Sequence, residues 1–166
     1  MRNGLVIADS GPIFSFSLID KLDVLTSLFD EIRIPKAVWN EISHDKTKPD
    51  YQRLCDFFKD KTCSIKGLNE LTFIMDYGES ESLILYKELN ADFLLIDDKK
   101  ARNIAETLDI KCIGTLGLLT KAKDKGLIGT LKPIFETFLQ NKRYYSIELL
   151  NAILISKGED RISVQK

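Results

Sequence analysis

Six acidic residues stand at positions where they could bind a divalent metal ion. They follow apolar, strand-like runs or lie in helix-like stretches, and they are Asp9, Glu41, Glu79, Glu81, Asp97 and Asp98. Carboxylates that gather in one crevice repel each other and raise each other's pKa, and a divalent cation relieves that repulsion. Mg²⁺ prefers oxygen ligands and is typically held by one or two carboxylates together with substrate phosphate. The chemistry that such a cluster would support is metal-assisted hydrolysis of a phosphate ester.

Each of these acids also has a purely structural explanation, which the sequence alone leaves open. Aspartates that directly precede a helix often cap its N-terminus, and this could explain Asp9, Asp97 and Asp98. Glutamates in a first helical turn complement the helix dipole, which could explain Glu79 and Glu81. Glu41 could lie on a solvated helix face. The sequence therefore supports the cluster as a whole better than any one of its members.

The histidine and the cysteines offer no competing site. His44 is the single histidine and lies in a polar stretch, and the three cysteines contain no CxxC pair: they are Cys55, Cys63 and Cys112. A zinc site would need such ligands at suitable spacing. We expect three reduced, partly buried thiols, because free cysteine usually packs as a small apolar side chain.

The composition is typical of a globular protein with one hydrophobic core. The chain has 166 residues, of which 44% are hydrophobic and 30% charged, and its net charge is −1. This length suits a single domain over residues 1–166. The charge gives no overall basic field of the kind that indicates a nucleic-acid partner. Because no apolar run is long enough for a membrane span or a signal peptide, we expect no membrane association and a cytoplasmic location.

Short apolar runs alternate with helix-like stretches along most of the chain. Strands are predicted at 5–9, 31–35, 93–97 and 110–114, with a weaker one at 62–66. Helices are predicted from Ile13 to Leu22 and at 36–42, 49–59, 79–90, 98–108, 115–126, 130–140 and 146–157. This alternation predicts a three-layer α/β/α sandwich with a central parallel sheet. The helices from about residue 130 would pack on the domain or on a partner, and their apolar stripe favours intramolecular packing: Leu131, Ile134, Phe135, Phe138 and Leu139.

Ligands of open parallel sheets bind beyond the carboxyl ends of the strands. Asp9 ends the first strand and Asp97 ends the most apolar one, so both are expected at that edge. The helix that carries Glu79 precedes its strand, so its start would lie near the opposite edge unless the chain doubles back, and the sequence pattern alone leaves this point open.

Five segments resemble the PIN domain, the fold of many toxin–antitoxin ribonucleases, and in particular a toxin-like PIN subfamily. They are IADSGPIFSFSLIDKLDVL (7–25), IPKAVWNEI (34–42), GESESLILYKELNADFLLIDDKKARNIAETL (78–108), IGTLGLLTKAKDKGLI (113–128) and KRYYSIELLNAILISKGE (142–159). Together they cover nearly the whole chain. The third segment is the most specific, and the others would be weak alone.

The resemblance implies a PIN-like sandwich with a catalytic, metal-binding site at the carboxyl edge. Its four acids would be Asp9, Glu41, Glu79 and Asp97, with Glu81 and Asp98 as substitutes if the alignment shifts. Ser10 and Thr115 would support the site, or act only in a turn or a cap. One departure is Gly11, which stands where relatives often carry a serine or threonine.

The function implied by the resemblance is that of an endoribonuclease that uses Mg²⁺ or Mn²⁺ to hydrolyse RNA phosphodiesters. Lys99, Lys100 and Arg102 could contact RNA phosphates, and so could Lys121, Lys123 and Lys125; the alternative for both groups is a solvated helix face. The resemblance further implies a possible toxin role, an antitoxin partner and a homodimer.

Three other functions are compatible with parts of the pattern. The main alternative is a catalytically silent PIN-like module that binds RNA or protein. A phosphoacceptor receiver domain would carry paired acids after the first strand, whereas Asp9 is followed by Ser-Gly-Pro. A haloacid-dehalogenase-like phosphatase would need a second aspartate at position 11, where this chain has Gly11.

Overall fold

A computed structural model describes residues 3–143 and 145–163 of the chain. It divides into two compact units, residues 1–115 and 116–166. The first unit contains the sheet and all six acids of interest, whereas the second consists mainly of helices. That residues 1–166 form a single domain stays a prediction.

The first unit is built on a five-stranded parallel sheet, as the sequence predicted. Its strands are β1 (Leu5–Ala8), β2 (Glu31–Pro35), β3 (Thr62–Cys63), β4 (Phe93–Leu95) and β5 (Cys112–Ile113). Their order across the sheet is β3-β2-β1-β4-β5, so β1 lies in the centre. Ala8 pairs with Leu95, and the Asp9 N–H continues the ladder with a 2.9 Å bond to the Leu95 carbonyl. Asp9 and Asp97 therefore leave neighbouring strands at the same edge.

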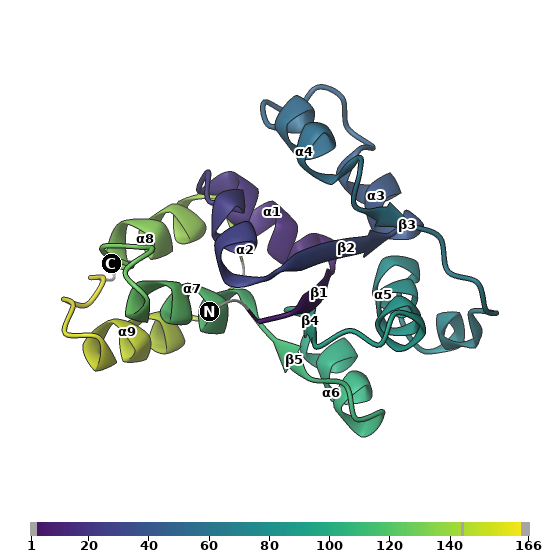
Figure 1. The fold of residues 1–166 in the computed structure, drawn as a ribbon. Coiled ribbons are helices and arrows are strands. Elements are labelled where there is room, and N and C mark those ends of the chain that lie inside the picture. The colour runs from purple at the N-terminus through teal and green to yellow at the C-terminus, as the bar shows by residue number, and fades with distance from the viewer. Residues whose placement is uncertain (1–2, 144, 164–166) are drawn as a thin grey trace. The chain divides into compact units, whose positions relative to one another are not determined.

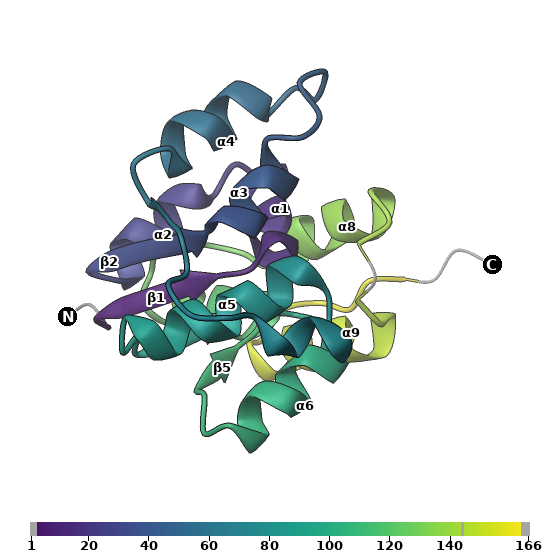
Figure 2. The same ribbon diagram turned by 90° about the vertical axis from the view of Figure 1, so that its right-hand side faces the viewer.

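Helices cover both faces of this sheet (Figure 1). In the first unit they are α1 (Ser10–Leu18), α2 (Leu22–Leu28), α3 (Lys36–Ile42), α4 (Tyr51–Phe58), α5 (Tyr77–Glu88) and α6 (Lys99–Thr107), with a 3₁₀ turn at Glu70–Phe73. Helices α1 and α2 lie on one side of the sheet and α5 on the other, along β1 (Figures 1 and 2). Ile7 and Leu94 of the sheet pack in one core cluster with Leu83 of α5 and Ala105 of α6. The predicted three-layer α/β/α architecture is confirmed.

The predicted helix from Ile13 to Leu22 is wrong in one respect, because the chain forms two helices there. Asp20 adopts a left-handed conformation with φ 54°. The N–H groups of Asp20 and Lys21 bond back to the carbonyls of Ser17 and Phe16, at 3.0 and 2.9 Å. This pattern is a Schellman motif, which ends a helix, and it forms most readily at glycine. An aspartate in that position gave no clear stop signal in the sequence.

The order of the elements left open at which edge α5 starts, and the resemblance implied the carboxyl edge. In a parallel sheet, each connecting helix returns from the carboxyl edge to the amino edge before the next strand begins. The chain leaves β3 at the carboxyl edge and reaches α5 through residues 64–76, so the first turn of α5 lies at the carboxyl edge. Glu79 is thereby placed on the same side of the sheet as Asp9.

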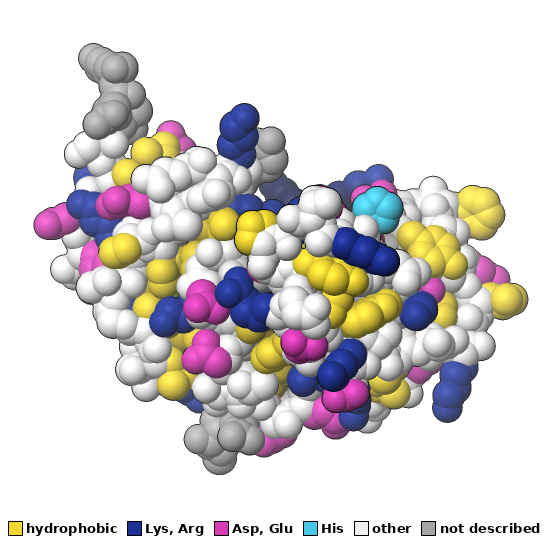
Figure 3. Space-filling model, turned by 90° about the horizontal axis from the view of Figure 1, so that it is seen from above, with side chains coloured by type: hydrophobic (Ala, Val, Ile, Leu, Met, Phe, Trp, Pro, Cys, Tyr) yellow, Lys and Arg dark blue, Asp and Glu magenta, His cyan; other side chains and the backbone are white. Residues whose placement is uncertain are grey.

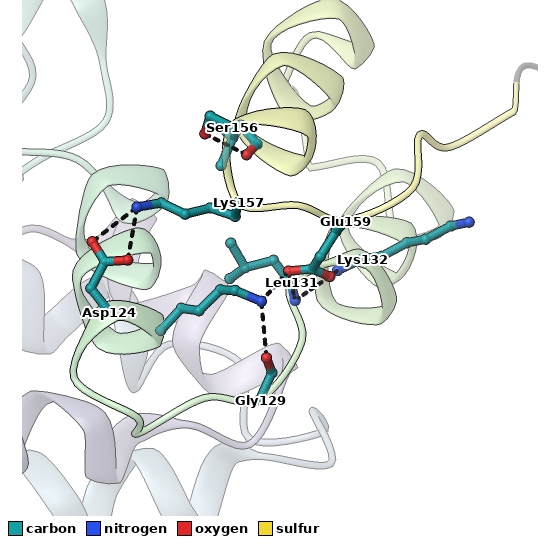
Figure 4. Close-up of polar contacts among 9 residues, drawn as sticks. Asp124, Gly129, Leu131, Lys132, Ser156, Lys157 and Glu159 are labelled. Carbon is teal, nitrogen blue, oxygen red and sulfur yellow. Dashed lines mark hydrogen bonds and ion pairs between the residues drawn. The ribbon is translucent and has the colours of Figure 1, made fainter.

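The second unit contains α8 (Lys132–Gln140), α9 (Ile147–Ser156) and most of α7 (Thr115–Asp124), which begins at the last residue of the first unit. The side chain of Glu159 joins the segment after α9 to the start of α8, as Figure 4 shows. Four residues of the predicted apolar stripe are buried and Leu139 is half-buried. None of the helices in the described part of the chain has the length and hydropathy of a membrane-spanning segment.

Candidate functional site

Asp9 is a buried carboxylate without the usual compensation. It occupies the N-cap position of α1 but makes no side-chain cap bond, so the capping explanation is not supported. Among the described residues, its Oδ1 atom is the one buried side-chain oxygen or nitrogen that has no hydrogen-bond partner. Burial raises its pKa to about 8, a hydrogen bond with the Ser10 backbone opposes this, and the charges of Glu41, Glu79 and Asp97 raise it further.

Glu41 reaches the same edge from α3, which begins directly after β2. Its carboxylate lies against the backbone of Gly78 in the first turn of α5. A Cβ atom at position 78 would collide with the Glu41 carboxylate, so any other residue there would require the flexible Glu41 side chain to move. Glu41 is exposed to solvent, which leaves its carboxylate accessible to a ligand.

Glu79 lies in the first turn of α5 and is half-buried. Its pKa is raised, first by burial and then by the charges of Asp98 and Asp76, with Glu41 adding a smaller effect. A hydrogen bond with the backbone of Asp76 opposes this rise. Because Asp76 is the N-cap of α5, that bond is one half of a capping box, and Glu79 therefore has a structural role as well.

Asp76 is an acid at this edge that the sequence interpretation missed. It is exposed, makes no side-chain cap bond, and acts electrostatically on Glu79. Its spacing of three residues before Glu79 is the signal of a helix N-terminus and could have identified it.

Asp97 is held firmly by the start of α7. Its two carboxylate oxygens accept the backbone N–H and the hydroxyl of Thr115, each at 2.7 Å. A Cβ at Gly114 would lie 2.9 Å from Arg102 Nη1 and 3.3 Å from Asp97 Oδ1, so the guanidinium and the carboxylate lie close to the same glycine. Thr115 thus fixes the direction of Asp97, and Arg102 brings a positive charge near it.

The two substitute acids have structural partners. Glu81 is only 6% exposed and its Oε2 accepts the Ala37 N–H at 2.8 Å, which satisfies the first turn of α3. Asp98 caps α6 by accepting the Ala101 N–H at 2.8 Å. Each bond gives its acid a structural role and occupies one carboxylate oxygen. Asp97 accepts two such bonds, so hydrogen bonding alone does not separate Glu81 and Asp98 from the acids that the resemblance favours.

The carboxylates fit a hydrated divalent cation better than a tight cage. Within residues 3–143 and 145–163, no three His, Cys, Asp or Glu side chains converge closely enough to surround an ion directly. Mg²⁺ does not require this, because it usually keeps several waters and binds one or two carboxylates. The unpartnered Oδ1 of Asp9 and the like charges around it are the features that a cation would compensate.

The remaining predicted residues differ in how accessible they are. Ser10 is the first residue of α1 and is half-buried beside Asp9. Lys99 and Lys100 are exposed at the start of α6. Lys123 is not available to RNA in the same way, because its ammonium group pairs with Glu159 at 2.6 Å. The three cysteines are free and half-buried, as expected.

Sequence comparison identifies the family. No curated protein sequence matches the chain significantly. The sequence profile of the PIN domain matches residues 5–159, which include every acid of the site described above. PIN domains are generally nucleases and typically bind divalent metals. The chain belongs to the PIN domain family.

Proposed function

We propose that the protein is an endoribonuclease that depends on Mg²⁺ or Mn²⁺, with the ion held by Asp9, Glu41, Glu79 and Asp97. The observation that carries this proposal is the buried Oδ1 of Asp9, which has no partner among the described residues although three other carboxylates act on its charge. The fold gains no stability from the ionised form of this group, because burying an unpaired charge is costly. A bound cation would supply the missing interaction.

Each residue has a separate part in this proposal. Asp9 would lose its proton when the ion binds, since the neutral form is favoured without it. Thr115 would keep Asp97 directed at the site through its two hydrogen bonds. Glu41 and Glu79 would complete the site from α3 and α5. A bound ion would lower the pKa of a coordinated water and would compensate negative charge on the phosphate.

The reaction would be an in-line attack of water on an RNA phosphodiester. The new P–O bond forms as the bond to the 3′ oxygen breaks, so the products carry a 5′-phosphate and a 3′-hydroxyl. Arg102 lies near Asp97 and would contact the phosphate, while Lys99 and Lys100 would contact neighbouring phosphates. The toxin role, the antitoxin partner, the homodimer and the cytoplasmic location stay predictions from the sequence.

The test is cleavage of a labelled single-stranded RNA in Mn²⁺ by the wild type, Asp9→Asn and Glu159→Gln. We expect Asp9→Asn to reduce the rate at least about a hundredfold, because the loss of a ligand costs more than the tenfold to hundredfold typical of outer-shell groups. Glu159→Gln changes a carboxylate outside the site, and its rate should stay within about twofold at a temperature where it remains folded.

Two results would contradict the proposal. One is equal cleavage by the wild type and Asp9→Asn, which would point to a contaminating nuclease or to another site. The other is a wild type that binds RNA but never cleaves it with Mg²⁺ or Mn²⁺, which would favour the catalytically silent module.

A further inference from the structure

A cleft opens directly beside Glu41, between α1 and α3. Its volume is about 530 Å³, and its walls include Phe14, Asn40, Glu41 and His44. This volume falls in the range of about 300–1,000 Å³ that is usual for small-molecule pockets. From this we infer that the cleft binds one nucleobase of a single-stranded RNA, next to the phosphate that is cleaved. The inference rests on the proposed function and specifies that the RNA substrate is single-stranded.

The side chains of the cleft match the faces and edges of a nucleobase. Phe14 is half-buried and presents an aromatic ring, and the imidazole of His44 is exposed. Aromatic rings bind unpaired bases by stacking, and this contact does not depend on base identity. Asn40 is exposed too, and its carboxamide can both donate to and accept from a base edge. In a duplex the bases stay stacked inside the helix, so the cleft selects single-stranded RNA.

Positive charge next to the cleft suits the phosphate of the bound nucleotide. Lys48 is exposed, and its Nζ lies 4.5 Å from the centroid of the Phe14 ring. Figure 3 shows the histidine side chain with Lys or Arg and hydrophobic side chains next to it on one face. Attraction between Lys48 and a phosphate would offset the repulsion that Glu41 exerts on the RNA backbone.

The strand order gives the RNA a path across the sheet edge. Helices α1 and α3 follow β1 and β2, whereas α6 follows β4 on the other side of β1. The acids at the ends of β1 and β4 therefore lie between the cleft and the exposed Lys99 and Lys100 of α6. A single strand could place a base in the cleft, the reacting phosphate at the acids and a further phosphate at these lysines.

Phe57 provides a matched control for Phe14. It is also half-buried, a lysine also lies 4.5 Å from its ring centroid, and it also lines a cleft. That cleft lies between α2 and α4, its walls include Asp20 and Arg53, and it contains none of the site acids. Replacing either phenylalanine with leucine keeps most of the apolar volume and removes the aromatic face.

The experiment measures the affinity of both variants for a fluorescein-labelled single-stranded RNA of about ten nucleotides, within the roughly 4–16 nucleotides that a single-strand-binding OB-fold covers. Fluorescence anisotropy in EDTA separates binding from cleavage. We expect Phe14→Leu to bind about tenfold more weakly and Phe57→Leu to bind like the wild type. In a series of oligonucleotides that each lack one base, the wild type should bind more weakly when the missing base is at one particular position. Phe14→Leu should bind all members of the series equally.

His44→Ala, a change at an exposed position, tests the same cleft if Phe14→Leu does not fold. It should weaken binding about fivefold. If the cleft variants and Phe57→Leu bind RNA with equal affinity, the inference is overturned even if the enzyme cleaves RNA. The same equal affinity is expected if the cleft binds a protein segment instead of a base. A selective loss in Phe14→Leu without any metal-dependent cleavage would support the cleft and refute the nuclease. A wild type that neither binds the RNA in EDTA nor cleaves it with Mn²⁺ would refute both.

Discussion

Asp9 is a buried carboxylate and Glu159 a half-buried one, and the two have opposite electrostatic properties. At the sheet edge of the first unit, the pKa of Asp9 is raised to about 8 by burial, and its Oδ1 has no hydrogen-bond partner among the described residues. In the second unit, burial would raise the pKa of Glu159 as well, but hydrogen bonds from Lys123, Leu131 and Lys132 reverse this and lower it. Lys123 donates at 2.6 Å. The backbone N–H groups of Leu131 and Lys132 donate at 2.9–3.0 Å (Figure 4).

This contrast separates a carboxylate that stabilises the fold from one that is available for a ligand. Glu159 keeps its charge because donors replace the water lost on burial. Asp9 has lost water without an equivalent set of donors, and it lies beside other carboxylates. The same chemical change, carboxylate to carboxamide, should therefore have effects of opposite sign at the two positions.

The largest stability effect is expected for Asp9→Asn, and it should depend on pH. The pKa of Asp9 is raised from about 3.9 in the unfolded chain to about 8 in the fold. Its contribution to stability is therefore present below about pH 3.9 and is lost as pH rises through 8. The carboxamide of the variant cannot ionise, so the variant should gain up to about 1.4 kcal/mol relative to the wild type for each pH unit between 4 and 8. Urea unfolding at several pH values in EDTA measures this.

Saturating Mn²⁺ should reverse that gain, because binding to the native state raises the stability of the wild type but not of Asp9→Asn. A wild type and variant whose difference in unfolding free energy is the same at pH 5 and pH 8 would show that Asp9 is already ionised and compensated. The contrast with Glu159 would then be lost.

The next largest effect is expected for Glu159→Gln, with the opposite sign. The variant should lose about 2 kcal/mol at pH 7, because hydrogen bonds to a charged group are worth more than neutral ones and Lys123 loses its partner. Since the pKa of Glu159 is lowered, this contribution is present above the unfolded value of about 4.3 and disappears as pH falls through the folded value. Thermal unfolding at pH 7 and pH 3 measures both parts.

Glu136→Gln serves as the control, since it changes a second carboxylate of the same unit, within α8. If Glu159→Gln proved as stable as this control at pH 7, Glu159 would not be the compensated carboxylate that the comparison requires.

The smallest effect on stability is expected for Thr115→Val. This change removes the 2.7 Å hydroxyl bond to Asp97 and keeps the 2.7 Å backbone bond. We expect a loss of about 1 kcal/mol and a several-fold fall in kcat. Thr115→Ser, which retains the hydroxyl, should recover the rate, and failure of this rescue would make the role of Thr115 one of packing alone. Steady-state cleavage and thermal unfolding of both variants distinguish these results.

Much of the fold could be predicted from local sequence patterns. The buried strand Leu5–Ala8 is a short apolar run that ends in turn-forming residues, and α6 follows an aspartate cap. These signals depend only on residues that are neighbours in the chain, so they can be recognised in a single sequence. The break at Asp20 was missed because the sequence does not show that this aspartate adopts a left-handed conformation, and an aspartate can also occur inside a helix.

The candidate site could be predicted only in part. Local pattern placed Asp9 and Asp97 at strand ends, but the resemblance to PIN domains was needed to choose Glu41 and Glu79 among many glutamates. No sequence pattern indicated that Glu81 bonds the Ala37 backbone, 44 positions earlier in the chain, or that Gly78 makes room for Glu41. Contacts between distant residues carry no periodic signal.

The sequence by itself determined the alternating strands and helices, and with the family match it determined membership of the PIN domain family. Only the tertiary structure decided which carboxylates are compensated and which are not. Both Asp9 and Glu159 are ordinary acids in the sequence, and the difference in their pKa arises from donors and charges that folding brings to them or withholds. The physical reason is that burial removes water from both, whereas hydrogen-bond partners come from residues that only the fold places nearby.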